Sequence, residues 1–323
     1  MNVAIPRVSL LGSALLLLAM VVSWSSGFIG YRYASDQGGV YLASLWRFIL
    51  AAAVLLPFAW KGLRALRRRD VIHQSLLGLF AIGGYIGPIA GAIQLGVAPG
   101  TAAVIANLLP LTIVVLAGCV PGQRTQGWQW LGLALCVLGM LVASSASVEW
   151  AAGNLWAYAL PLLAVFSLAA ATLYQKATPG VSMPAPTALF IQVCAVTPVF
   201  AVLAHFEGGL LPPTSAGFAA GVAWLVLFAT VGGYGFYWLC LQRFSVQRIS
   251  GALFLAPPIT LLWAWLQFGD PLPISALAGI GLTLLGLPLL GMKATDTADN
   301  RESRRDEVDE CAGKVRSLGE VAE

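Results

Sequence analysis

The chain has 323 residues, of which 59% are hydrophobic and only 10% charged, and its formal net charge is +4. Because a soluble globular domain carries about a quarter charged residues, this composition excludes a soluble globule and indicates an integral membrane protein. The stretches between the apolar runs are too short for a soluble domain, so any function must lie among the helices.

The apolar runs predict an all-α fold with ten transmembrane helices. A helix of about 20 residues crosses the roughly 30 Å of bilayer hydrocarbon, and runs of that length recur with short polar breaks. The first run follows Arg7, but it has span length and no small-residue cleavage site closes it, so we expect a retained helix. The expected spans are residues 10–31, 39–60, 73–94, 100–120, 127–146, 154–175, 187–205, 216–238, 249–268 and 273–292.

The basic residues predict the orientation of these spans. With the N-terminus inside, the outer connections hold one cation, Arg32, and the remaining loop cations lie inside, as the positive-inside rule requires. We therefore expect both termini in the cytoplasm and a multi-pass protein of the inner (plasma) membrane. Residues 293–323 are dense in both charge signs and predict a solvated cytoplasmic tail. The inner cations are Arg7, Lys61, Arg64, Arg67, Arg68, Arg69, Arg124, Lys176, Arg243 and Arg248.

One cation, Arg47, lies inside the second expected span, in SLWRFILAAAVLLPFAW. Such a residue costs roughly 2.5–3.5 kcal/mol on insertion scales and usually faces the bundle interior or a water-filled cavity. No Asp or Glu lies in any expected span, so Arg47 has no evident carboxylate partner there. Two interpretations follow. The guanidinium binds a carboxylate or phosphate of a substrate, or it bonds to backbone carbonyls and extends toward the outer interface.

In the third span, Gly83, Gly87 and Gly91 recur every four residues. This spacing is typical of helices that pack closely in a membrane, where small residues let the backbones approach. We expect a packing role for these glycines.

Prolines predict breaks in the fourth and ninth spans. Asn107 lies three residues before Pro110, and Pro258 stands at the corresponding place in the second half. A proline ring removes a backbone N–H and leaves a carbonyl unpaired, and irregular backbone is tolerated in a membrane beside a water-filled cavity. We expect Pro110 and Pro258 to be hinge or cavity elements.

Further aromatic and amide side chains inside the spans are candidates for contact with a substrate. Together with Arg47 they predict an aromatic-lined cavity with one cation and a few amides, which fits amino acids or related amphiphilic metabolites. No metal site is expected, because the two histidines, His73 and His205, fall at opposite membrane edges. No cofactor or nucleic-acid partner is expected. The candidates are Trp24, Tyr85, Asn107, Tyr174, Gln192, Tyr234 and Trp238.

Landmarks of the first half recur in order in the second half. They predict a tandem repeat of five helices, with residues 1–148 as the first repeat and 149–292 as the second. Because five is odd, the second repeat enters the membrane from the opposite side, as in many secondary transporters. The recurring pairs are Gly83-Gly84-Tyr85 with Gly232-Gly233-Tyr234, Gln94 with Gln242, Pro110 with Pro258, and Gly122, Gly132 and Gly139 with Gly269, Gly279 and Gly286.

Several stretches resemble the EamA family of the drug/metabolite transporter superfamily. They are SWSSGFIGYRYA, LASLWRFILAAAVL, AIQLGVAPGTAAVIANLLPLTIVVLAG and WQWLGLALCVLGMLV in the first half, with QRFSVQRISGALFLAPPITLLWAWLQFGD and LAGIGLTLLG in the second. The resemblance covers roughly residues 10–292. It implies ten helices in two inverted repeats around a central cavity, and export of amino acids or other small metabolites.

The leading hypothesis is a secondary transporter that exports small metabolites by alternating access. An enzyme is not expected, because the spans supply no cluster of acid, base or metal-binding groups. A membrane sensor or assembly protein on the same fold is the alternative. A proton-coupled cation or drug exporter is disfavoured. Small multidrug exporters of the same superfamily couple protons to cation export through a glutamate in their first helix, and the first expected helix here has none. The substrate, the direction, the coupling ion and the oligomeric state stay open, although ten helices suffice for a monomer to enclose a cavity.

Overall fold

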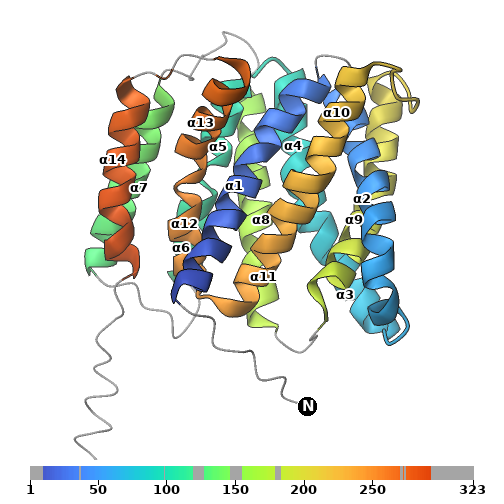
Figure 1. Ribbon diagram of the computed structural model, residues 1–323, viewed down its shortest axis with the longest axis horizontal. Coiled ribbons are helices and arrows are strands. Elements are labelled where there is room, and N and C mark those ends of the chain that lie inside the picture. The colour runs from blue at the N-terminus through green and yellow to red at the C-terminus, as the bar shows by residue number, and fades with distance from the viewer. Residues whose placement is uncertain are drawn as a thin grey trace, which may run out of the picture. The chain divides into compact units, whose positions relative to one another are not determined.

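The computed structural model describes residues 10–35, 38–97, 99–118, 127–145, 155–178, 183–269, 272 and 274–291. All regular elements in these ranges are helices, as expected (Figure 1). The expected charged tail, residues 293–323, lies outside the described residues. The α-helices are α1 (Leu10–Ser35), α2 (Val40–Leu63), α3 (Arg68–Gly78), α4 (Gly84–Gln94), α5 (Pro99–Ala106), α6 (Leu109–Gly118), α7 (Gly127–Ser144), α8 (Ala159–Ala177), α9 (Ala185–Glu207), α10 (Ala216–Trp224), α11 (Gly235–Arg243), α12 (Val246–Leu253), α13 (Ala256–Phe268) and α14 (Ile274–Gly291).

Within the described residues, seven helical segments are long and apolar enough to cross a membrane, and three further apolar helices are shorter. The long segments include composite ones, because α3 and α4 run on through the π-helix η1 (Leu79–Gly83), and α10 and α11 through the π-helix η4 (Leu225–Tyr234). Large apolar side chains such as Phe58 and Leu163 are exposed on the outside of the bundle. Such exposure is typical of a surface that faces lipid rather than water, so the protein is a multi-pass membrane protein.

The two halves of the chain are interleaved rather than separate. Helix α2 packs along α9, α1 along η4, and α4 along α8. The rings of Phe48 and Phe200, 5.1 Å apart, join α2 to α9. The core is therefore shared, and it consists mainly of residues from α2, η1, α4, α8, α9 and α11.

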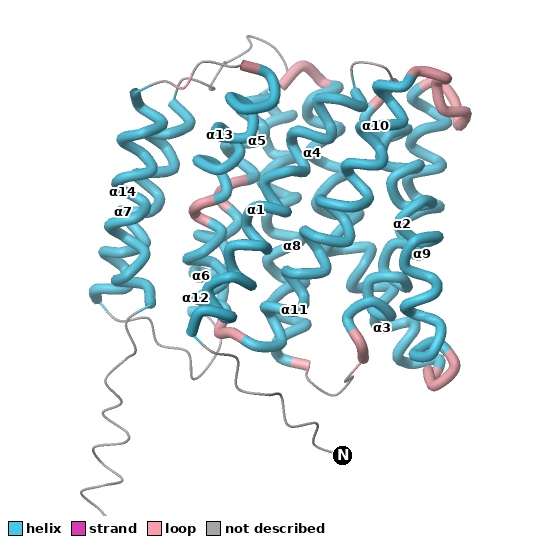
Figure 2. The backbone as a smooth tube through the Cα atoms, in the orientation of Figure 1, coloured by secondary structure: helices cyan, strands magenta, loops and turns pink. Residues whose placement is uncertain are grey.

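Both expected breaks occur. The fourth segment is interrupted at Asn107 and Leu108, between α5 and α6, and the ninth at Phe254 and Leu255, between α12 and α13 (Figure 2). Each proline lies in the first turn of the helix that follows its break, where a missing N–H costs nothing. The break thus falls a few residues before the proline rather than at it.

Of the three glycines in the ridge predicted for the third span, Gly91 is the one that is closely approached, since a Cβ atom added there would lie 3.0 Å from the Tyr41 hydroxyl. A Cβ atom added at Gly87 would meet no atom within 4 Å, and one at Gly83 would make only an ordinary contact at 3.5 Å. The neighbours at Gly83 and Gly91 are side chains of other helices rather than backbone, and a packing role for the three glycines stays a prediction.

Close backbone approach occurs instead between α7 and α14. A Cβ atom on Gly139 would lie 2.7 Å from the Gly279 carbonyl oxygen, and one on Gly286 would lie 2.7 Å from the Gly132 carbonyl oxygen. No larger side chain fits at either contact without a shift of the helices. The pairs run in opposite order along the two helices, so α7 and α14 are antiparallel.

Candidate functional site

A cavity of about 610 Å³ lies between the two halves of the helical unit. Its lining on α1 begins at Trp24 and ends at Arg32, and its lining on α4 ends at Ile93, so it occupies the half of the bundle at the C-terminal ends of α1 and α4. Its walls are mostly apolar. The lining residues are Trp24, Gly27, Phe28, Ile29, Tyr31, Arg32, Val40, Arg47, Tyr85, Ile86, Ile89, Ala90, Ile93, Ala103, Val104, Asn107, Ala229, Tyr234, Pro257, Thr260, Leu261 and Ala264.

Arg47 lines this cavity and is only 2% exposed. Its Nε donates to the Thr230 hydroxyl at 2.6 Å, and its Nη1 donates to the Tyr31 hydroxyl at 3.1 Å. Both partners are neutral hydroxyls, and neither is a backbone carbonyl. The partners are therefore not the backbone carbonyls of the second interpretation, and substrate binding by Arg47 stays a prediction.

The hydroxyls that receive these bonds are themselves fixed. Thr230 lies in the π-helix η4, and its hydroxyl donates to the Leu225 carbonyl, five residues back, at 3.0 Å. The Tyr31 hydroxyl is 2.8 Å from the Ser44 hydroxyl, which donates to the Val40 carbonyl. The guanidinium is thus held against one wall by groups from α1 and η4, which orients it without neutralising its charge.

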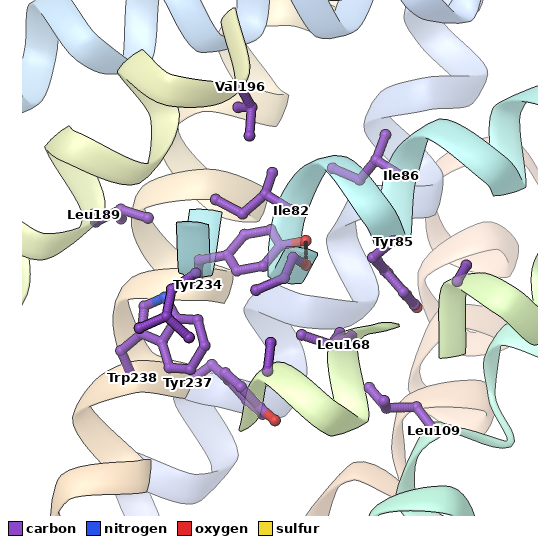
Figure 3. Packing of buried hydrophobic residues seen from close by; sticks show 14 of the residues in the cluster. Ile82, Tyr85, Ile86, Leu109, Leu168, Leu189, Val196, Tyr234, Tyr237 and Trp238 are labelled. Atoms are coloured by element: carbon purple, nitrogen blue, oxygen red, sulfur yellow. Dashed lines mark hydrogen bonds between the residues drawn. The ribbon is translucent and has the colours of Figure 1, made fainter. Parts of the chain in front are cut away.

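An aromatic cluster lies at the inner end of the cavity. The Trp24 ring is 6.0 Å from the Tyr85 ring and 5.3 Å from the Tyr234 ring, and all three residues line the cavity. The Tyr234 hydroxyl donates to the Ala81 carbonyl, within η1, at 3.4 Å (Figure 3). Tyr85 and Tyr234 occupy corresponding places in the two halves of the sequence, so the cluster is built jointly by both.

The two helix breaks flank the cavity. Asn107 lines it from the break between α5 and α6, whereas Pro110 is buried and does not line it. Of the two prolines at the start of α13, Pro257 lines the cavity, whereas the predicted Pro258 is buried and does not line it. Five of the predicted residues line the cavity together, namely Arg47, Trp24, Tyr85, Asn107 and Tyr234.

Three predicted substrate contacts lie elsewhere, nearer the opposite end of the bundle. Gln192 is 1% exposed, and its side-chain amide donates to the side-chain Oε1 of Gln74 at 2.8 Å and accepts from Trp238 Nε1 at 2.9 Å. Tyr174 is 53% exposed, and its ring is 5.3 Å from the His73 ring. None of the three lines the described cavity.

Sequence reasoning did not find Tyr31, Thr230 or Thr260. Tyr31 stands in the quoted GFIGYRYA stretch, but its pairing with Arg47 follows only from the packing of α1 against α2 and η4. Thr230 is 183 residues from Arg47, and no sequence pattern signals that contact.

A carboxylate joins two helices next to the lining residues Val40 and Ile93. Glu207, at the end of α9, accepts the backbone N–H of Leu42 at 2.8 Å and the side-chain amide of Gln94 at 2.5 Å. It thereby caps the positive N-terminal end of α2 and ties it to the end of α4. Among the described residues, no group of three or more His, Cys, Asp or Glu side chains is placed to hold a metal ion.

Comparison with known proteins agrees with this architecture. The model of the EamA-like transporter family matches residues 11–145 and again residues 154–292. A solved crystal structure matches with a TM-score of 0.73 at 16% identity, over 86% of this chain and 96% of that chain, so the fold is shared.

Curated relatives extend over most of the chain. A probable terminal-alkyne amino-acid exporter of Streptantibioticus cattleyicolor is 27% identical over 86% of this chain and 92% of its own length. A probable amino-acid metabolite efflux pump of Salmonella typhimurium is 26% identical over 84% and 92%. An uncharacterized inner membrane transporter, YedA of Escherichia coli, is 24% identical over 76% and 79%. The chain belongs to the EamA-like transporter family and is a membrane transporter, as the resemblance in its sequence predicted.

Proposed function

We propose that this protein exports amino acids or related small carboxylated metabolites across the inner (plasma) membrane by alternating access. One observation carries the proposal. A buried guanidinium, Arg47, faces the cavity with only neutral hydroxyls as hydrogen-bond partners.

The charge of Arg47 makes an anion the best complement for the cavity. A buried cation without a counter-ion is costly, and an opposite charge with good hydrogen-bond geometry relieves that cost. The bonds to Thr230 and Tyr31 use two of the five guanidinium N–H donors. A carboxylate fits the planar fork of the same group and binds it in a bidentate manner. A cation or cationic drug is repelled at this wall.

The remaining walls suit the body of such a substrate. Ile86, Ile89 and Leu261 offer apolar surface, while Trp24 and the two tyrosines offer aromatic faces. An aromatic face also attracts an ammonium group, which an amino acid carries next to its carboxylate. The names of two relatives, an amino-acid exporter and an amino-acid metabolite efflux pump, support the same class of substrate.

The proposal includes ten membrane crossings in two inverted repeats, residues 1–148 and 149–292, with both termini in the cytoplasm. The antiparallel contact of α7 and α14 supports the inversion. Gly132 corresponds to Gly279 and Gly139 to Gly286 in the sequence repeat, and each touches the other's equivalent. Equivalent helices that run antiparallel are related by an axis in the membrane plane, as in inverted-repeat transporters.

The helix breaks supply places where one repeat can move against the other. At each break one backbone N–H bonds three residues back instead of four. Leu108 donates to the Ile105 carbonyl at 3.0 Å. Leu255 likewise donates to the Ala252 carbonyl at 3.0 Å. We infer that these breaks, with Pro110 and Pro258 behind them, act as hinges. A single chain encloses the cavity, so a monomer suffices for transport.

The test is efflux of labelled amino acids and organic acids from proteoliposomes, with two matched variants. Val104→Trp fills the cavity from its wall, whereas Val202→Trp places the same bulk on an exposed face of α9. We expect efflux of at least one carboxylated compound that Val104→Trp abolishes and Val202→Trp preserves. Equal efflux through both variants, or efflux of cationic compounds alone, would contradict the proposal.

A further inference from the structure

The walls of the cavity carry different polar groups. Where α1, α2 and η4 meet, Arg47 supplies a positive charge and N–H donors, and Tyr31 and Thr230 hold it in place. From α5, Val104 and Asn107 line the cavity. Among the described residues that line it, none is an Asp or a Glu. A positive group on a substrate must therefore be bound by neutral acceptors.

The wall on α5 ends in a broken turn that leaves carbonyl groups without their usual donors. In a regular helix the Val104 carbonyl accepts from the N–H four residues later, but the Leu108 N–H bonds to the Ile105 carbonyl instead, at 3.0 Å. The Ala106 carbonyl would accept from residue 110, which is Pro110 and has no N–H. Two carbonyls of one turn thus lose their helical donors.

The Asn107 side chain lies in this broken turn. Its residue lines the cavity, and it is the only side-chain amide among the described lining residues. The Asn107 backbone N–H donates to the Ala103 carbonyl at 2.9 Å. Its side-chain amide forms no hydrogen bond within the described part of the chain. The amide oxygen is therefore available to accept a hydrogen bond from a ligand.

The end of α5 favours a positive group. The C-terminal end of a helix carries a partial negative charge of about half an elementary charge, and interrupted helices in transporters bind cations at such ends with their unwound carbonyls. A metal cation alone would add to the uncompensated charge of Arg47. An ammonium group that arrives on the same molecule as a carboxylate does not, because the carboxylate compensates the guanidinium.

The corresponding break in the second half lacks this amide. The repeat that pairs Pro110 with Pro258 pairs Asn107 with Leu255, which lies in the break between α12 and α13. The Leu255 N–H also bonds three residues back, to the Ala252 carbonyl at 3.0 Å. A leucine is thus compatible with such a break, so the backbone geometry does not explain the amide of Asn107.

We propose that Asn107, together with the carbonyls at the end of α5, binds an ammonium group of the substrate while Arg47 binds its carboxylate. This inference rests on the proposed function and narrows the substrate to zwitterions, which carry both groups. The aromatic faces in the cavity attract an ammonium group without accepting a directed hydrogen bond. Asn107 is then the residue that distinguishes an amino acid from a hydroxy acid of the same shape.

Binding of matched compounds to the purified protein in detergent tests the proposal. Leucine and its α-hydroxy analogue form one pair, and ε-aminocaproate and its ε-hydroxy analogue form a pair with a longer separation of the two groups. Isoamylamine carries an ammonium group without a carboxylate. Asn107→Leu introduces the residue found at the second break. Thr112→Val is the control, because the Thr112 hydroxyl donates to the Leu108 carbonyl at 3.1 Å beside the same break, and Thr112 does not line the cavity.

We expect the native protein to bind the amino member of at least one pair about tenfold or more tightly than the hydroxy member, since hydrogen bonds to a charged group are strong. Asn107→Leu should remove this preference without changing the Kd of the hydroxy member, and Thr112→Val should keep the preference.

Two results would overturn the proposal and leave carboxylate binding at Arg47 standing. They are equal binding of both members of each pair by the native protein, and a preference that survives Asn107→Leu. Binding of isoamylamine that depends on Asn107, with no binding of any carboxylate, would support the ammonium site and refute the proposed function.

Discussion

Replacing Arg47 separates a substrate-binding role from a structural one. A hydrogen bond to a charged group contributes about 1.5–3 kcal/mol, so a bidentate carboxylate contact contributes about 3–6 kcal/mol. Because 1.4 kcal/mol corresponds to about a tenfold change in Kd, Arg47→Met should weaken carboxylate binding by at least about 100-fold. Arg47→Lys keeps the charge but loses the planar fork, and we expect an intermediate loss of about tenfold.

The same change should leave the fold intact. After Arg47→Met the Thr230 hydroxyl still donates to Leu225, and the Tyr31 hydroxyl still has Ser44, so no polar group is left without a partner. Replacing buried charges by apolar groups of similar volume is often neutral or stabilising, by about 1–4 kcal/mol. The melting temperature should therefore hold or rise while binding is lost.

Two measurements in detergent distinguish substrate binding by Arg47 from a structural role. They are the Kd for a labelled carboxylated substrate and the Tm from tryptophan fluorescence. Leu56→Met, on an exposed face of the same helix, should change neither. A structural anchor would give the reverse pattern, with a fall in Tm and an unchanged Kd, and that pattern would refute the reasoning.

Two other substitutions test the packing. Gly139→Ala brings a methyl group against the Gly279 carbonyl and should cost about 1–3 kcal/mol, seen as a lower Tm. Gly87→Ala meets nothing within 4 Å, and should leave Tm unchanged or raise it through the better helix propensity of alanine. Gln192→Leu leaves Trp238 Nε1 without its acceptor. We therefore expect the free energy of unfolding to fall by about 1–3 kcal/mol, seen as a lower Tm. An unchanged Tm for Gln192→Leu would mean that water replaces the amide.

The sequence predicted those features that depend on local chemistry. Runs of apolar residues located the helices, and the prolines located the two breaks to within a few residues, because a missing N–H acts on its own helix. Arg47 was singled out because a charge in hydrocarbon is costly whatever its partners are.

Features that depend on contacts between distant segments were missed. The π-helices η1 and η4 need wider turns that follow from packing, and their sequences read as ordinary apolar helix. The spacing of Gly83, Gly87 and Gly91 suggested a close contact, yet no backbone lies opposite Gly87. The hydroxyl partners of Arg47 come from α1 and η4, and only the fold brings them together.

His73 offers a test of how the closed end of the bundle relates to transport. Both of its ring nitrogens are buried without a partner, next to Tyr174. His73→Phe keeps an aromatic ring in this place and removes the two unpaired atoms. Each such atom destabilises the described state by about 1–3 kcal/mol, so the variant should have a higher Tm.

If the opposite end of the bundle must open for transport, stabilising its closed form slows the cycle. The two atoms together give a shift of about 2–6 kcal/mol, which lowers the population of the other state by roughly 30-fold or more. Transport by His73→Phe should then fall while the substrate Kd of the described cavity holds, since His73 does not line it. His205→Phe, an exposed position at the other end, is the matched control and should transport normally. A higher Tm with an unchanged transport rate would show that opening at His73 plays no part in the cycle.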